Sequence, residues 1–194
     1  MKKIIITMIV VLTSITTWSQ NQSSEHLAFK GVPIDGKLNE YVTKMKNNGF
    51  THIGTEKGVT FLRGDFASYK NCIIGVSTLD KVDLVNKISV AFPERENWSS
   101  LSNNYFSLKE MLIEKYGQPS EVVEEFQSYS EPRDDNSKMH EVMMGTCKYY
   151  SIFTTDKGNI ELSISGSINL SCVVLSYYDK INSEKIRAKA IDDL

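Results

Sequence analysis

The sequence predicts an α+β protein of two tandem units, each a helix followed by four antiparallel strands, with the helices packed on one face of the sheet. The stretch from Cys147 to Tyr178 favours this fold because it predicts three consecutive strands, the first two of which alternate in the faces that their side chains present. Two helical patterns that each stop at a glycine precede two such runs of strands. Each run closes on an apolar strand, KISVAF in the first and CVVLSYY in the second.

The alternation is clearest in the middle strand of the last three. Ile160, Leu162 and Ile164 share one face, and polar residues occupy the other. Gly158, in the turn before this strand, supplies the positive φ that a tight hairpin requires. An antiparallel sheet with one apolar face has to cover that face, so we expect a helix over Ile160, Leu162 and Ile164.

The first unit is expected to begin with a helix that has Asp35 as its N-cap and Gly49 as its left-handed stop. Leu38, Val42 and Met45 recur at helical spacing and form its buried stripe. The strands expected after this helix are residues 50–55, 59–65, 70–79 and 84–92.

The second unit is expected to begin with a helix capped by Ser102 and stopped at Gly117. Tyr105, Leu108 and Leu112 form its buried stripe. A strand at residues 122–126 and a long exposed loop at residues 127–138, which is polar and broken by proline, precede the three strands of the Cys147–Tyr178 stretch. The two units recur at a period of about 70–75 residues, which indicates an internal duplication.

The N-terminus has the pattern of a cleaved export signal. Lys2 and Lys3 precede an apolar run at residues 4–12, and small residues favour cleavage before Gln20. That run is too short to span a membrane, and no cysteine near the cleavage site offers a lipid attachment point. The expected organisation is a signal peptide at residues 1–19, a first α+β unit at 20–93, a second at 94–180 and a tail at 181–194 that forms a short helix.

The net charge limits the kinds of partner that are expected, and the cysteine positions limit the disulfides that can form. The formal net charge is −2, and no basic patch points to nucleic acid. After signal cleavage no apolar run is long enough for a membrane span. Cys147 and Cys172 are expected on strands separated by another strand, about 9–10 Å apart, which exceeds the limit of about 7 Å for a disulfide. Three buried free thiols, or one disulfide from Cys72 to Cys147 or Cys172, remain as alternatives.

No catalytic or metal-binding motif is present, and no cofactor is expected. The sequence lacks HExxH, GxSxG, GxGxxG and the phosphate-binding loop. His52 is expected to be a satisfied core or edge histidine, and His26 and His140 to be solvated. Two carboxylate clusters are expected on solvated surface rather than in an acid–base pair. They are Glu121, Glu124 and Glu125, and Asp134 and Asp135.

Three segments carry a resemblance to known proteins: FLRGDFASYKNCIIGV, the helix end KYGQP, and YYSIFTTDKGNIELSI. These segments resemble uncharacterised exported α+β proteins of Gram-negative bacteria. The tandem arrangement resembles that of β-lactamase-inhibitor-protein-like domains. The resemblance implies a fold and a periplasmic or extracellular location, and it implies no reaction. No inhibitory loop can be matched residue by residue, so inhibitor activity is not carried over.

Adjacent tyrosines are the remaining feature of interest. Neighbours along a strand face opposite ways, so the pairs Tyr149–Tyr150 and Tyr177–Tyr178 each send one ring to each face of the sheet. The outward rings, with Trp98 or Tyr69, are candidates for an exposed aromatic patch that binds a protein or a glycan. Ordinary pairing of aromatic rings between strands is the alternative.

We therefore expect an exported, non-enzymatic binding module that uses an open sheet face or residues 127–138. Its partner would be an envelope or extracellular protein, or a glycan. One alternative is a small periplasmic hydrolase, which requires a cleft where a histidine or cysteine meets a carboxylate. Another is an envelope assembly or chaperone-like factor, which requires a long edge strand without inward charges or proline.

Overall fold

The computed structural model describes residues 25–79, 82–128, 130–167 and 170–192, so the expected signal peptide lies outside the described residues. The fold is α+β, with a large antiparallel sheet and four helices in the described part of the chain. In chain order the elements are β1 (Ala28–Phe29), β2 (Val32–Pro33), α1 (Leu38–Asn47), β3 (Thr51–Glu56), β4 (Val59–Phe66), β5 (Tyr69–Leu79), β6 (Val82–Ala91), α2 (Trp98–Tyr116), β7 (Glu121–Phe126), α3 (Asp135–Met144), β8 (Cys147–Thr155), β9 (Gly158–Ser167), β10 (Leu170–Asp179) and α4 (Lys180–Asp192).

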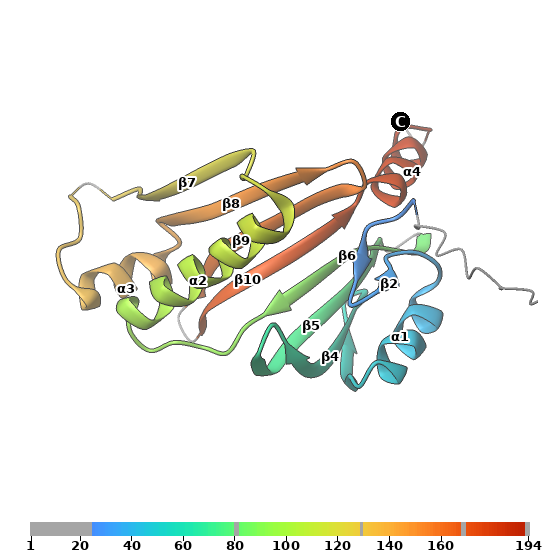
Figure 1. Cartoon of the computed structure of the whole chain (residues 1–194), viewed down its shortest axis with the longest axis horizontal. Coiled ribbons are helices and arrows are strands. Elements are labelled where there is room, and N and C mark those ends of the chain that lie inside the picture. The colour runs from blue at the N-terminus through green and yellow to red at the C-terminus, as the bar shows by residue number, and fades with distance from the viewer. Residues whose placement is uncertain (1–24, 80–81, 129, 168–169, 193–194) are drawn as a thin grey trace, which may run out of the picture.

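Eight strands form one sheet in the order β3-β4-β5-β6-β10-β9-β8-β7. Strands β6 and β10 meet in the middle, where Ala91 pairs with Val174 and Lys87 with Tyr178. Strands β3 to β6 lie on one side of this junction, and β7 to β10 lie on the other (Figure 1). The strand positions agree closely with those expected from alternation.

One face of the sheet is covered and apolar. Ile160 and Leu162 are fully buried and Ile164 is 8% exposed, as the alternation predicted. On β8 the Ser151 hydroxyl lies 2.7 Å from the Tyr105 hydroxyl of α2, so α2 lies on this face. The short β1–β2 hairpin packs on the same face. The Phe29 ring of this hairpin contacts Tyr177 at a centroid distance of 5.5 Å. The hairpin was not predicted from the sequence.

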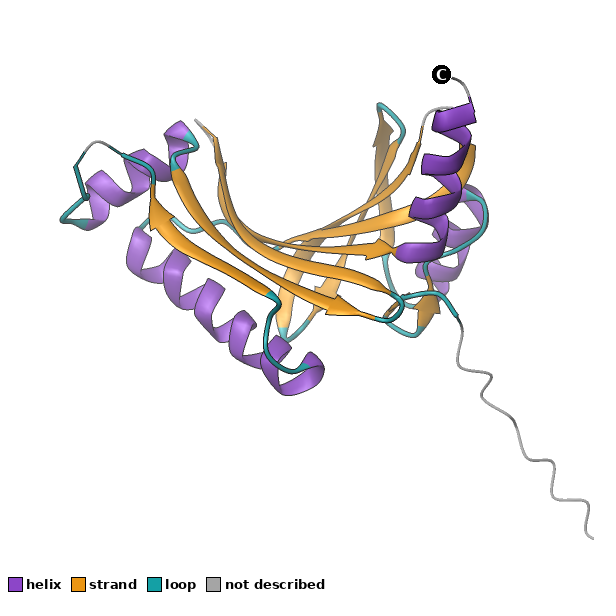
Figure 2. Ribbon diagram, turned by 90° about the horizontal axis from the view of Figure 1, so that it is seen from above, coloured by secondary structure: helices purple, strands orange, loops and turns teal. Residues whose placement is uncertain are grey.

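The other face of the sheet is open. Figure 2 shows the sheet bent into a trough that opens on the side away from α2. Helix α4 rises at one end of this trough, so not every helix shares the covered face (Figure 2). Among the described elements, none crosses the middle of the trough. We call the surface that lines it the open face.

The first helix starts later than predicted. The residue before α1 is Lys37, and Asp35 is instead drawn into contacts with His26 and Asn182. The far end of the helix agrees with the prediction. Gly49 has φ +88°, and the Phe50 amide donates to the Met45 carbonyl at 3.2 Å, the pattern of a glycine-terminated helix.

The second helix starts earlier than predicted. Its N-cap is Asn97, whose side chain accepts a hydrogen bond from the Ser100 amide at 2.9 Å, and Ser102 is buried inside the helix. The predicted stripe of Tyr105, Leu108 and Leu112 is buried, and Gly117 ends the helix as expected.

The expected exposed loop at residues 127–138 is partly wrong, because α3 begins within it. Asp134 and Ser137 form a capping box, in which the Asp134 side chain accepts from the Ser137 amide and the Ser137 hydroxyl accepts from the Asp134 amide. Gly145 ends the helix in the left-handed conformation.

Strand β6 departs from simple alternation near its start. Two register shifts against β5 place Val85, rather than Leu84, with Ile88 and Val90 among the buried residues. Helix α4 begins at Lys180 in place of the short helix expected in the tail at residues 181–194, and its Ile186 is buried while Ala190 is exposed. The described helices include none that is both long and apolar enough for a bilayer.

Candidate functional site

The middle of the open face has a floor of small side chains. Gly75 of β5, Ser89 of β6 and Ser176 of β10 are direct neighbours across three strands. The Ser89 and Ser176 hydroxyls are 3.0 Å apart. Ser163 of β9 lies one row further along, opposite Val174. The outward side chains are short here, and Gly75 and Ser176 are buried, with the Val59 and Phe61 side chains of β4 next to Gly75.

Larger polar and aromatic groups surround this floor. The Lys87 ammonium lies 4.7 Å from the centre of the Tyr178 ring, a cation–π contact. The Tyr150 hydroxyl donates to a Glu121 carboxylate oxygen at 2.6 Å. This hydrogen bond favours the neutral phenol and raises the pKa of Tyr150 above its ordinary value. The surface therefore offers both charges and amphipathic rings to a partner.

The tyrosine pairs behave as their spacing predicts, but the aromatic patch does not form as expected. Tyr149 and Tyr177 pack with the covered core, and Tyr150 and Tyr178 lie on the open face. By register, Tyr150 faces Ser163 and Tyr178 faces Asn159, so other residues separate the two rings. A further candidate, Trp98, is buried at 7% exposure.

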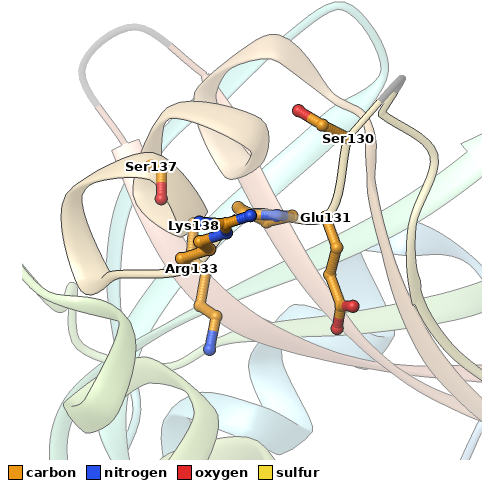
Figure 3. Close-up of a pocket in the computed structure, with 6 residues that line it drawn as sticks. Ser130, Glu131, Arg133, Ser137 and Lys138 are labelled. Atoms are coloured by element: carbon orange, nitrogen blue, oxygen red, sulfur yellow. The ribbon is translucent and has the colours of Figure 1, made fainter.

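The second predicted binding element, residues 127–138, forms its own shallow pocket of about 740 Å³, which is lined by residues within 130–138 (Figure 3). Figure 3 shows Arg133 close to Lys138, with the Lys138 and Glu131 side chains extending the same way. The residues that line the pocket are Ser130, Glu131, Pro132, Arg133, Ser137 and Lys138. One short stretch supplies all of them, so no groups converge here from distant parts of the chain.

This segment is also tied to the start of α2. Asp135 accepts hydrogen bonds from the Ser99 amide and the Ser99 hydroxyl, each at 3.1 Å. The Lys138 ammonium lies 6.0 Å from the centre of the Trp98 ring. These contacts give Asp135 and Lys138 structural roles, and they favour the open face over this pocket as the binding surface.

A buried polar cluster joins the N-terminal hairpin to the start of α4. The Asp179 carboxylate is fully buried and accepts from the Leu27 amide at 2.8 Å and the Asn182 amide at 2.9 Å. His26 Nδ1 lies 2.9 Å from Asp179, so the expectation of a solvated His26 is wrong. Asp179 thus holds the hairpin while capping the first turn of α4.

Asn182 completes this cluster from the other side. Its side-chain nitrogen donates to the Ile34 and Val85 carbonyls at 3.1 and 2.9 Å and to Asp35 at 3.1 Å. Burial alone would raise the pKa of Asp35, but the Asn182 hydrogen bond, the Gly36 amide and nearby positive charge bring that pKa below its ordinary value. The cluster therefore binds four chain segments into one junction.

A hydrolase would need more than the His26–Asp179 pair. His26 Nε2 lies 3.6 Å from Asp35, so both ring nitrogens face carboxylates rather than a nucleophile. His52 is exposed on β3, 3.3 Å from the Thr55 hydroxyl, and His140 is exposed on α3. Within the described ranges, no three or more His, Cys, Asp or Glu residues gather as a metal site would require.

The predicted carboxylate clusters stay apart. Glu124 pairs with Lys109 at 2.6 Å, Glu121 bonds Tyr150, and Glu125 is exposed. Hydrogen bonds from the Ser137 amide and hydroxyl lower the pKa of the Asp134 carboxyl. Glu124 forms an ion pair, Glu121 accepts a hydrogen bond between strands, and Asp134 caps a helix. None of these contacts is an acid–base pair, in agreement with the expectation that both clusters lie on the solvated surface.

The three cysteines are buried free thiols. Burial raises the pKa of Cys147 to about 12 and that of Cys172 to about 11, and it also raises the pKa of Cys72. The thiolate is the nucleophile, so burial disfavours the reactive form of these side chains.

Both edge strands of the sheet, β3 and β7, have features that hinder pairing with a further strand. On β7, Glu124 shares the face of Tyr149, its partner on β8, and so carries a charge toward the covered side. Strand β3 has a register shift between His52 and Gly54. Inward charges and irregular pairing hinder the addition of a further strand, so the strand-addition role finds no support at these edges.

No protein-family model, curated protein or solved structure matched the chain. The function of the protein is therefore inferred from the geometry of its structure. The floor residues were visible in the sequence as the polar positions of the alternating strands, but nothing local marked them as neighbours. The His26–Asp179 contact joins opposite ends of the chain and carried no local signal.

Proposed function

We propose that the protein is an exported, non-enzymatic binding module whose contact surface is the open face. The observation that carries this proposal is the floor of Gly75, Ser89 and Ser176 at the middle of a trough that no described element crosses. Short side chains at the base of a concave surface let a partner's side chains come close to the sheet around Ser89, while Val59 and Phe61 already pack beside Gly75. Concave surfaces are typical of binding sites.

The groups around the floor suit a protein partner better than a glycan. A flat row of exposed rings would favour sugar stacking, but Tyr150 and Tyr178 are separated and each is already engaged, by Glu121 and Lys87 respectively. Rings that combine an apolar body with a polar tip are enriched in protein interfaces. A polypeptide that presents a projecting loop or helix would fill the trough.

We also infer that the chain contains two related α-β4 units. Helix α1 precedes β3 to β6, and α2 precedes β7 to β10, with α3 inserted after β7. The strand order runs outward from β6 and β10 in the same sequence on both sides. This symmetry supports the expected duplication, and it would give the trough two similar walls.

A substitution in the trough tests the proposal. Ser163→Arg places a long charged side chain on the open face, and Ser107→Arg places the same side chain on the exposed side of α2. We expect the protein to retain one partner from an envelope extract, with loss of that partner in Ser163→Arg and retention in Ser107→Arg. Equal retention by both variants would rule out the open face as the contact surface.

A hydrolase remains the second candidate because His26 and Asp179 are within hydrogen-bond distance. It predicts turnover of a generic ester or peptide that His26→Ala abolishes while circular dichroism remains unchanged. Such a result would replace the binding proposal with an enzymatic one. Under the binding proposal, neither the native chain nor His26→Ala turns over these substrates.

A further inference from the structure

Glu161 of β9 places a carboxylate on the open face, inside the trough. Its chain neighbours Ile160 and Leu162 are fully buried on the covered face, so the Glu161 side chain points to the opposite side of the sheet. Across the strands Glu161 pairs with Ser176 of β10, one of the floor residues, and with Ile152 of β8. It is half-buried, and both β8 and β7 lie between it and the edge of the sheet.

The Glu161 carboxylate has no counter-charge within the described part of the chain. Among the described residues, none forms an ion pair or a hydrogen bond with it. The Glu121 hydrogen bond is the main cause that raises the pKa of Tyr150, and the charge of Glu161 adds to it, so the Glu161 carboxylate lies close to this phenol. The phenol nevertheless donates its proton to Glu121.

Three basic residues of the strands share the open face with Glu161, and each is placed elsewhere. The Lys87 ammonium lies 4.7 Å from the centre of the Tyr178 ring. The Lys148 ammonium donates to the backbone carbonyl that follows α3, at 2.9 Å. Arg63 lies on β4, with three strands between it and β9. The negative charge of Glu161 therefore remains available to a partner.

A partner that covers the trough removes the water that solvates Glu161. An ionised carboxylate taken out of water is strongly destabilised unless a cation and hydrogen bonds compensate it. A charge-assisted hydrogen bond from Lys or Arg is among the strongest available contacts. An acidic or neutral side chain at this position is disfavoured by comparison, so Glu161 selects between partners by charge.

The side chains around Glu161 suit the stem of a long basic residue. Ile152 on β8 and Val174 on β10 are half-buried on the same face of the sheet. Lys and Arg side chains cover apolar surface with their methylene groups while the charged head reaches a polar group. The Tyr150 ring adds an aromatic surface that attracts a cation. A small inorganic cation would leave these apolar groups uncovered.

We propose that the partner of the open face is a polypeptide that inserts a Lys or Arg side chain into the trough and pairs it with Glu161. The stem of that side chain lies against Ile152 and Val174. This pairing rests on the proposed function, because it requires the open face to be the contact surface.

Peptide display on the full chain tests the pairing. A library of random linear peptides is selected on the native protein, and peptides that also bind Ser163→Arg are removed, which leaves those that bind the open face. We expect the remaining peptides to share a Lys or Arg at one fixed position. Replacing that residue by norleucine, which keeps the stem and removes the charge, should weaken binding by about tenfold or more in calorimetry.

Two substitutions of Glu161 and a matched control make the result specific. Glu161→Gln keeps the size of the side chain and should weaken the selected peptides by about tenfold or more. Glu110→Gln removes the same charge from the exposed side of α2 and should leave their affinity unchanged. A selection on Glu161→Lys should return peptides with Asp or Glu at the corresponding position. Circular dichroism verifies that each variant is folded.

The outcomes separate this pairing from the proposed function. Peptides that lose binding to Ser163→Arg but carry no cation, or that bind Glu161→Gln as well as the native chain, overturn the pairing and leave the open face as the contact surface. Equal weakening by Glu161→Gln and Glu110→Gln also overturns the pairing, because it indicates a general effect of net charge. If every enriched peptide binds Ser163→Arg undiminished, or if no peptide is enriched, both proposals fall.

Discussion

The two faces of the eight-stranded sheet are built from the same strands but differ in how they are filled. On β9, Leu162 lies in the covered core with no exposed surface, and its neighbour Ser163 is half-buried on the open face. On β10, the Tyr177 ring packs against Phe29 of the β1–β2 hairpin on the covered face, and the Tyr178 ring makes a cation–π contact with Lys87 on the open face. Residues adjacent in the chain therefore belong to different environments.

This difference separates stability from recognition. The covered face gains its stability by removing large apolar side chains from water. Small or already hydrogen-bonded side chains on the open face, such as Ser89 with Ser176, contribute less to folding. Substitutions on the open face should therefore leave the fold intact, which makes it the surface free to match a partner.

The largest expected effect comes from truncating the covered face. Leu162→Ala leaves a cavity under α2 and should lower the free energy of unfolding by about 2–5 kcal/mol. Ser163→Ala, one residue along, should change it by no more than about 0.5 kcal/mol. Urea denaturation monitored by circular dichroism measures both. Similar losses for the two variants would mean that the faces are not energetically distinct.

Removing Asp179 should have the next largest effect. Asp179→Ala leaves the Leu27 and Asn182 amides without their acceptor, and we expect a loss of about 3 kcal/mol. Hydrogen exchange should accelerate in the β1–β2 hairpin and in α4. Asp35→Ala is the control, because Asp35 is 44% exposed at its side chain and should cost less. Equal exchange in both variants would contradict this role for Asp179.

Buried phenols should make the protein sensitive to alkali. Burial raises the pKa of Tyr41, Tyr105 and Tyr177 above the ordinary tyrosine value. The unfolded chain releases these protons first, so stability is complete below about pH 10 and falls as the pH rises further. Urea midpoints measured across this range should decrease, and less steeply in Tyr177→Phe. A flat profile would contradict the effect of burial.

The smallest effect concerns a tyrosine of the open face. The Glu121 hydrogen bond raises the pKa of Tyr150, so Glu121→Ala should lower that pKa toward the ordinary value. Ring-carbon chemical shifts measure the titration of Tyr150 directly. The pKa of Tyr177 should stay unchanged in this variant, because the pKa of Tyr177 is raised mainly by burial on the other face of the sheet. A parallel change in both rings would show that the faces are electrostatically coupled.

Much of the fold was predictable because strand alternation is a local signal. The positions of β8 and β9 followed from period two, that of β10 followed from an apolar run, and Gly49 and Gly117 marked two helix ends. Helix α3 was missed because its polar composition and the preceding Pro132 imitate a loop. Its true signal was the Asp134–Ser137 capping box, which is short and easily outweighed by composition.

Less of the candidate site could be predicted, because its residues meet only through register. Gly75, Ser89 and Ser176 come from three strands, and their contact depends on how β5, β6 and β10 align. The register shifts between β5 and β6 had no sequence signal, and they bury Val85 where strict alternation with Ile88 and Val90 would bury Leu84. The His26–Asp179 contact likewise needed the two ends of the fold to be placed together.

The junction of β6 and β10 has a consequence for how the chain folds. Among the paired strands of the described sheet, these two alone are not neighbours along the chain. The other pairings join strands that follow each other along the chain, across short turns or, for β7 and β8, across α3. The β6–β10 pairing instead has to bring together strands separated by α2, β7, α3, β8 and β9, which costs more chain entropy. We therefore expect the junction to form late and to limit the folding rate, with each half of the sheet exposing an unpaired edge until then.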